Sequence, residues 1–217
     1  TLVDPNDTVV FAVPSWNNNH YTYLNGAKAV VVEATPEQNF MPRASDIKPY
    51  IQQATLVALC SPQNPTGTVF SKEGLEEICD LILAENLRRG SDAKPVYLMY
   101  DQIYWALTHG NTKHYDPVSL RPEMKNYTVF VDGISKSLAA TGVRVGWSMG
   151  PKKVIDKMKA ILTHIGAWAP KPEQMATAKY LNDLTQYDKF LAEQKVKISA
   201  RLDGFYTTSC DLFNHPF

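Results

Sequence analysis

The sequence predicts an α/β fold with a mainly parallel sheet, and three observations support this. Short runs rich in β-branched residues alternate with longer stretches of helical periodicity. Several of the short runs are continuously apolar, as at residues 30–32 and 129–131, which is typical of strands covered on both faces. No internal repeat or low-complexity segment interrupts the alternation.

The composition is that of a globular domain. The chain has 217 residues, of which 44% are hydrophobic and 20% charged, so it is long and apolar enough to bury a core. The 22 basic and 22 acidic residues give a formal net charge of zero, which favours neither nucleic acid nor an anionic membrane as a partner. No apolar run reaches the ~18 residues that span a bilayer, and the first residues do not resemble a signal peptide.

The cysteines indicate a reducing compartment. Cys60, Cys79 and Cys210 are odd in number and far apart in the sequence, which argues against a disulfide framework or a zinc site. We therefore expect a cytoplasmic protein. The chain has no initiator methionine and opens on a turn signal, so we also expect it to be a fragment.

Six strands are predicted, in chain order, at residues 8–13, 29–33, 56–60, 96–100, 128–132 and 144–149. A helix is predicted between Ser71 as its N-cap and Gly90 past its end, because apolar residues between them recur at helical spacing. A second apolar stripe comprises Val154, Met158, Ile161, Leu162 and Ile165.

A longer helical stretch is predicted at residues 173–202, with a break near 183–185. Residues 203–217 show no clear period. Pro170 and Pro172 mark the expected joint between the sheet domain and this helical stretch.

Ligands of open parallel sheets bind beyond the carboxyl ends of the strands. This rule directs attention to residues 14–16, 61–67, 101–104 and 135–136. In the second of these segments, Pro62, Pro65 and Gly67 make a stiff loop that can aim the amide of Asn64, although an ordinary turn is the alternative.

Asp101 ends an apolar strand and could cap a helix, bind a metal or pair with a cationic ring nitrogen. Lys136 follows another apolar strand, a position that suits a Schiff-base lysine because desolvation makes amines nucleophilic, unless it is a surface lysine. Arg144 lies between Gly142 and Gly146, which allow the backbone to approach a ligand closely, and its donors suit a phosphate unless it forms a surface ion pair.

Taken together, these groups have the chemistry that holds pyridoxal phosphate (PLP). The hydroxyl of its ring takes donors, its nitrogen takes a carboxylate, its aldehyde takes an amine and its phosphate takes an arginine. That set is supplied by Asn64, Asp101 with Tyr104 three residues on, Lys136 and Arg144, which we expect all to follow strands of one parallel sheet.

The sequence resembles the fold-type-I, class I/II aminotransferases, of the aspartate aminotransferase type, that use this cofactor. The matching stretches are residues 64–67, 100–104, 135–136 and 141–147, and with residues 14–16 the resemblance covers about residues 4–170. It implies a three-layer α/β/α fold. Residues 1–170 would be the PLP-binding large domain, incomplete at its N-terminal side, and residues 171–217 a truncated helical connection towards a small C-terminal domain.

The resemblance also implies a role for each residue. Lys136 would hold the cofactor as an imine and act as the catalytic base, and Asp101 would pair with the protonated ring nitrogen. Asn64 and Tyr104 would bind the phenolic oxygen, and Arg144 the phosphate. Trp16 would stack on the ring, with a core position as its alternative.

The chain departs from the family pattern at two places. A serine that donates to the phosphate often precedes the lysine by three residues, where this chain has Gly133. The alternatives are that Ser135 donates instead or that this hydroxyl is missing. A histidine that supports the aspartate is replaced by Asn19, with His20 one residue further. His109, His114 and His164 are expected to be surface or packing residues.

The resemblance places other parts of the site outside this chain: the glycine-rich phosphate-binding turn, the arginine that binds the substrate carboxylate, and a tyrosine from the partner of a homodimer. We therefore expect weak or no turnover from these residues alone. The implied reaction moves an amino group between an amino acid and a 2-oxo acid, of the aspartate or aromatic type. The alternatives are a PLP-dependent lyase or synthase of the same fold, or the effector-sensing domain of a transcription regulator.

Overall fold

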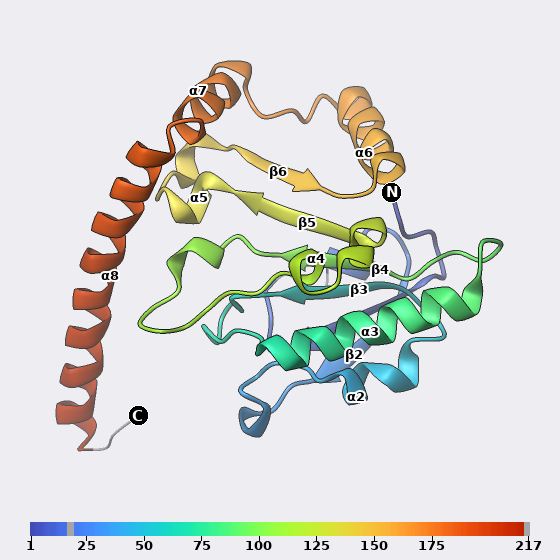
Figure 1. The fold of residues 1–217 in the computed structure, drawn as a ribbon, viewed down its shortest axis with the longest axis horizontal. Helices are drawn as coiled ribbons and strands as arrows, with labels where there is room; N and C mark the ends of the chain where they lie inside the picture. The colour runs from blue at the N-terminus through green and yellow to red at the C-terminus, as the bar shows by residue number, and fades with distance from the viewer. Residues whose placement is uncertain (17–19, 215–217) are drawn as a thin grey trace.

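The computed structural model of the chain describes residues 1–16 and 20–214, without the side chains of residues 20 and 21. Its centre is one six-stranded sheet in the order β2-β1-β3-β4-β5-β6 (Figure 1). The strands are β1 Thr8–Val13, β2 Lys28–Glu33, β3 Ala54–Cys60, β4 Tyr97–Asp101, β5 Thr128–Gly133 and β6 Gly146–Met149. The six strands predicted from the sequence are thus confirmed, with shifts of one or two residues at half of their ends.

The helices occupy the connections between strands and the C-terminal part of the chain. The long ones are α3 Lys72–Arg89, α6 Lys152–Ile165, α7 Lys171–Leu181 and α8 Leu184–Phe213. The short ones are α1 His20–Tyr23, α2 Ala44–Ile47, α4 Pro117–Leu120 and α5 Ile134–Ser137. Single 3₁₀ turns are η1 Pro36–Gln38, η2 Lys48–Tyr50, η3 Trp105–Leu107, η4 Pro122–Asn126 and η5 Thr141–Val143.

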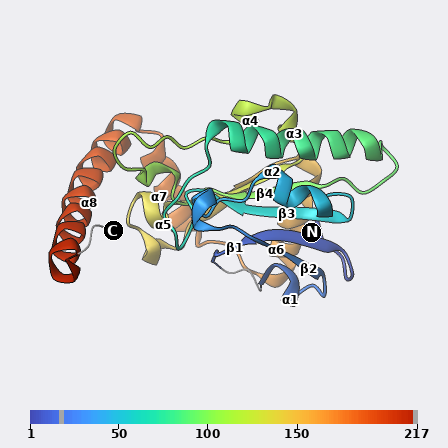
Figure 2. The ribbon, with the colours of Figure 1, turned by 90° about the horizontal axis from the view of Figure 1, so that it is seen from below.

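The core lies on both faces of the sheet, as the apolar runs predict. Helix α3 packs Leu75, Ile78 and Ile82 against Val57 and Leu98 on one face. Val154 of α6 packs against the other face, in a smaller cluster. Figure 2 shows α3 and α4 on one side of the sheet and α6 on the other. Each fully buried aliphatic side chain stabilises such a core by about 1.5–3 kcal/mol.

The ends of α3 form as the sequence predicts. The hydroxyl oxygen of Ser71 accepts a hydrogen bond from the Gly74 amide at 3.0 Å, which satisfies one of the free N–H groups of the first turn. Gly90 ends the helix with a φ of 68°, a conformation that glycine adopts without strain.

Two expectations from the sequence are wrong. Residues 203–213 are helical, because α8 continues to Phe213. No residue of α8, all of which the structure describes, is buried. The expected break occurs at Asn182 and Asp183, where the carboxylate of Asp183 caps α8 by accepting from the Gln186 amide at 3.0 Å.

The second wrong expectation concerns strand direction near Arg144. Strands β1 to β5 pair in parallel, whereas β6 pairs with β5 in the antiparallel sense, with Asp132 opposite Trp147. Because β6 begins at Gly146, Arg144 precedes a strand and does not follow one. The start of an antiparallel β6 lies at the same edge as the carboxyl end of β5, so Arg144 still reaches that edge. Helix α8 runs beside this edge (Figure 1).

Candidate functional site

The loops at the carboxyl edge of the sheet are joined by backbone and side-chain hydrogen bonds. The Ser61 amide donates to the Asp101 carbonyl at 2.9 Å, and the Gln102 amide donates to the Val131 carbonyl at 3.0 Å. Nε2 of Gln63 donates to the carbonyl of Pro14 at 2.7 Å. Neighbouring loops after β1, β3, β4 and β5 are therefore fixed to one another, which is what a site assembled from four strand ends requires.

Asn64 and Tyr104 meet across this edge. Nδ2 of Asn64 donates to the hydroxyl of Tyr104 at 3.1 Å. The loop that carries Asn64 closes through the Gly67 amide, which donates to the Gln63 carbonyl at 2.8 Å, and Gly67 has a φ of 71°. The two side chains line one cavity of about 430 Å³. An amide donor and a phenol are thus aimed at the same point.

Asp101 is a largely buried carboxylate at the end of β4. Its Oδ1 accepts a hydrogen bond from the Ile103 amide at 3.1 Å. Burial raises the pKa of Asp101 above its ordinary value, and the nearby charge of Asp132 raises it further. A cation next to Asp101 would stabilise the charged carboxylate and so lower its pKa, against the effects of burial and of Asp132. Among the described residues, no group of three or more His, Cys, Asp or Glu side chains is placed to hold a metal ion.

Cys60 is the neighbour of Asp101 on β3, because the two residues are paired in the parallel register. Burial raises the pKa of the Cys60 thiol to about 12. The thiol is therefore neutral near pH 7 and adds no negative charge beside Asp101.

Lys136 lies in α5, directly after β5, and is partly buried. Its Nζ stands 5.7 Å from the centroid of the Tyr104 ring, within the range of a cation–π contact. The amine therefore lies next to the phenol that contacts Asn64.

Hydrogen bonds to backbone carbonyls link Arg144, through Thr141, to the segment that carries Lys136. Arg144 is exposed, has a φ of 61°, and donates to the Thr141 carbonyl at 2.9 Å. The hydroxyl of Thr141 donates to the carbonyl of Ser135 at 3.0 Å. A non-glycine residue in the left-handed region is strained, and such strain concentrates at functional sites. We expected Gly146 to let the backbone approach a ligand, but the structure gives another reason for the missing side chain. A Cβ there would meet the Asp132 carbonyl at 3.0 Å, so glycine permits the pairing of β6 with β5.

Trp16 follows β1 and is 65% exposed, so the core alternative for this residue is wrong. Gly133 has a structural reason to lack a side chain, because a Cβ would meet the Val145 carbonyl at 2.9 Å. Asn19 and the side chain of His20 lie outside the described residues.

Sequence reasoning missed three polar residues of this edge: Gln63, Asp132 and Gln102. Asp132 is 6% exposed and accepts hydrogen bonds from the Gly133 amide at 2.7 Å and from Nε2 of Gln102 at 3.2 Å. Its signal was present in the sequence, since an acidic residue directly after an apolar run has the same pattern as Asp101. Gln63 gave no such signal, because a single glutamine in a turn is ordinary.

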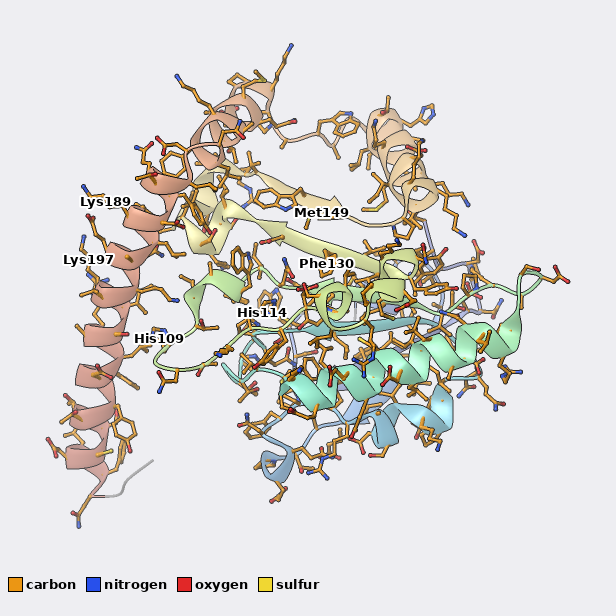
Figure 3. The ribbon with its side chains drawn as sticks, viewed as in Figure 1. His109, His114, Phe130, Met149, Lys189 and Lys197 are labelled. Carbon is orange, nitrogen blue, oxygen red and sulfur yellow. The ribbon has the colours of Figure 1, made fainter. Side chains whose placement is uncertain are left out.

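A second cavity, of about 760 Å³, opens on the face of the sheet that α3 covers. Its lining includes Phe130 and Met149, which are paired across β5 and β6, and His114 (Figure 3). The ring of His114 packs against that of Tyr100 with centroids 5.9 Å apart, and burial lowers the pKa of this histidine. His114 is therefore a packing residue, as expected. His109 contacts Ser199 of α8 at 3.1 Å, and His164 is exposed.

The family model for aminotransferase class I and II matches residues 1–209. The chain belongs to this family. It is 31% identical over 207 residues to an aspartate aminotransferase of Bacillus sp. (strain YM-2), covering 94% of this chain and 50% of that protein. It is 31% identical over 184 residues to the aspartate/prephenate aminotransferase of Thermus thermophilus, covering 84% of this chain and 44% of that protein.

The solved structures agree with this membership. An aspartate aminotransferase from Thermus thermophilus with maleate superposes with a TM-score of 0.84 at 28% identity, covering 93% of this chain and 50% of that chain. The sheet flanked by helices is therefore the α/β fold of these transferases, and the expected fold class is confirmed. The chain spans about half the length of the aminotransferases it matches.

The side chains at the carboxyl edge fit the cofactor that this aminotransferase family uses. The ring of PLP requires a carboxylate, hydrogen-bond donors and an amine. Asp101 is a largely buried carboxylate with no cationic partner among the described residues. The amide of Asn64 contacts the phenol of Tyr104, and Lys136 lies beside that phenol. Within the described residues, no helix is both long and apolar enough to cross a membrane.

Proposed function

We propose that this chain forms the cofactor-binding part of a PLP-dependent aminotransferase, which moves an amino group between an amino acid and a 2-oxo acid. The observation that carries the proposal is the juxtaposition of Lys136, Tyr104 and Asn64 at the strand ends, with Asp101 on the neighbouring strand. Family membership over residues 1–209 supports it.

Each side chain has a task that its surroundings suit. When bound, PLP supplies an electron-withdrawing ring that stabilises negative charge at the substrate's α-carbon. Lys136 holds the cofactor through Nζ and, once released, takes the α-proton on the same nitrogen. Asp101 keeps the ring nitrogen protonated, because its carboxylate gains a cationic partner only in that state.

The remaining residues bind and orient. Asn64 and Tyr104 donate to the phenolic oxygen, and Arg144, with Ser135 as a further donor, binds the phosphate. Trp16, exposed at the end of β1, stacks on the ring. The substrate is of the aspartate or aromatic type, a proposal supported by relatives named as aspartate and aspartate/prephenate aminotransferases.

The proposal extends to organisation and location. Residues 1–170 form the PLP-binding domain, and residues 171–217 connect it to a further domain. Exposed apolar side chains of α8, such as Val196, Phe205 and Leu212, support contact with such a domain or with the second subunit of a homodimer. Three free cysteines support a cytoplasmic location.

The test uses the full-length protein that contains this chain, with Lys136→Ala and Lys125→Ala as the matched pair. Lys125 is an exposed lysine just before β5, at the opposite edge of the sheet. We expect Lys136→Ala to abolish the visible absorption of the lysine-bound cofactor and to lower kcat by at least ~10²–10⁴-fold, with Lys125→Ala unchanged. Unchanged absorption and activity in Lys136→Ala would contradict the proposal.

A panel of amino acids then separates the reactions. An aminotransferase converts each accepted amino acid to its 2-oxo acid and leaves the cofactor aminated. Release of ammonia, carbon dioxide or a cyclised product would instead indicate a lyase, decarboxylase or synthase of the same fold.

A further inference from the structure

Asp132 is a buried carboxylate to which the proposed function gives no task. It is 6% exposed, and it takes part in none of the ion pairs formed among the described residues. A buried carboxylate without a cation is costly unless several donors satisfy its oxygens. The donors that satisfy its oxygens therefore show which segments of the chain Asp132 holds together.

The donors come from two neighbouring turns. Nε2 of Gln102 donates to Oδ2 at 3.2 Å, and the side chain of Trp105 adds another hydrogen bond. The amide of Gly133 donates to Oδ1 at 2.7 Å. One carboxylate thus joins the turn after β4 to the end of β5.

The first turn carries Tyr104. Gln102 and Trp105 stand on either side of the Ile103–Tyr104 pair, and the Trp105 amide donates to the Gln102 carbonyl at 2.9 Å, which closes the turn. Asp132 therefore anchors both ends of the turn that presents the phenol.

The second segment leads to Lys136. Gly133 is the last residue of β5, and α5, which carries Lys136, begins at the next residue. The backbone at Gly133 is packed so closely that a Cβ would meet the Val145 carbonyl at 2.9 Å. Asp132 anchors this segment through the Gly133 amide, three residues before the lysine whose Nζ lies 5.7 Å from the Tyr104 ring.

Asp132 acts from the opposite face of the sheet. Asp101 is paired with Val131 in the parallel register, so Asp132 projects on the other side from Asp101. Asp132 therefore does not border the ring nitrogen, and it acts through the two turns.

We propose that Asp132 is a positioning residue of the cofactor site, whose carboxylate fixes the Tyr104 turn relative to Lys136. The inference rests on the proposed function. The two oxygens accept from separate donors, Oδ1 from the Gly133 amide and Oδ2 from Nε2 of Gln102. Asparagine has one acceptor oxygen and one donor group, so it would turn a donor toward one of these two donors.

The test measures PLP affinity and steady-state kinetics of the full-length protein, with the Lys136 adduct trapped by borohydride in every variant. We expect Asp132→Ala to weaken PLP binding and lower kcat by about 10- to 100-fold each, as misplacement of a reacting group does. The KM for the amino acid should change less, because Asp132 holds no substrate group. Asp132→Asn should fall between Asp132→Ala and the natural protein.

Two further variants separate positioning from loss of stability. Ile78→Val destabilises the core of α3, far from the site, by about 0.5–1.5 kcal/mol and should leave PLP affinity unchanged. Trp105→Phe keeps an aromatic ring and removes one donor to Asp132, so it should reproduce part of the affinity loss even if Asp132→Ala does not fold.

The outcomes are distinct. Suppose that the natural protein forms the Lys136 adduct and that Asp132→Asn and Trp105→Phe bind PLP with affinities within twofold of the natural affinity. This result would overturn the positioning role and leave the proposed function intact. Absence of the Lys136 adduct from the natural protein would overturn both.

Discussion

The sheet region, residues 1–150, and the helical region, residues 152–213, differ in how much of their sequence they bury. Strands β1 and β3 are buried along almost their whole length. In the helical region the structure describes every residue, and only Val154 in α6 and Thr177 in α7 are buried within the helices. Ile161 and Ile165, predicted to lie on an apolar stripe, are 46% and 66% exposed.

This difference indicates where the site belongs. Trp16, Asn64, Asp101, Lys136 and Arg144 all lie in the region that has its own core, and hydrogen bonds across strand ends fix most of their loops. The helices present apolar side chains that neighbouring described residues do not cover. We therefore infer that the first region is a scaffold for the cofactor and the second a contact surface.

The largest expected effect contrasts the two regions directly. Ile82 is fully buried, whereas Phe205 is 74% exposed. We expect Ile82→Ala to lower the free energy of unfolding by about 2–5 kcal/mol, and Phe205→Ala to change it by less than about 0.5 kcal/mol. Urea titration of the 217-residue chain followed by circular dichroism measures both. Equal losses in the two variants would remove the contrast.

A smaller effect tests the scaffold near Lys136. An alanine at Gly133 would place a Cβ 2.9 Å from the Val145 carbonyl, whereas nothing lies within 4 Å of a Cβ at Gly142. Gly133→Ala should cost about 1–3 kcal/mol through overpacking, and Gly142→Ala less than about 0.5 kcal/mol. Thermal unfolding compares the pair. A Gly133→Ala variant as stable as Gly142→Ala would mean that the backbone there is looser than described.

The smallest effect concerns the charge of the site. Because the pKa of Asp101 is raised in the folded chain, this group binds its proton more tightly folded than unfolded. Its contribution to stability therefore falls as the pH rises from about 4 through the folded pKa. Without cofactor, the free energy of unfolding of Asp101→Asn at pH 7 should exceed that of the natural chain by about 0.5–2 kcal/mol. This free energy should also fall less in the variant as the pH rises over that range.

The same substitution should weaken PLP binding by the full-length protein, since asparagine cannot pair with a protonated ring nitrogen. Denaturation midpoints at several pH values, together with a PLP titration, check both halves of this prediction. A destabilised Asp101→Asn variant at pH 7 would contradict the role given to Asp101.

The sequence predicted the sheet, which the structure confirms, and it suggested the proposed site residues, because strands and strand ends both leave local signals. Apolar runs such as 129–131 identify buried strands, and polar residues directly after them identify the ligand-binding edge. The resemblance to class I/II aminotransferases then connected Asn64, Asp101, Lys136 and Arg144 into one pocket.

The features that the sequence did not predict depend on long-range geometry. The direction of β6 is invisible to periodicity, since a strand has the same pattern in either sense. The end of α8 was missed because residues 203–213 show no clear helical period in the sequence. Asp132 has the same sequence pattern as Asp101, but its hydrogen bonds to Gln102 and Gly133, from which we infer its role, are seen only in the folded chain.

The central claim is that the amine of Lys136 carries PLP. Borohydride reduction of the full-length protein, followed by peptide mass mapping, tests it most directly. We expect one reduced pyridoxyl adduct, on the peptide that contains Lys136. An unmodified Lys136 peptide, or an adduct on another lysine, would contradict the claim.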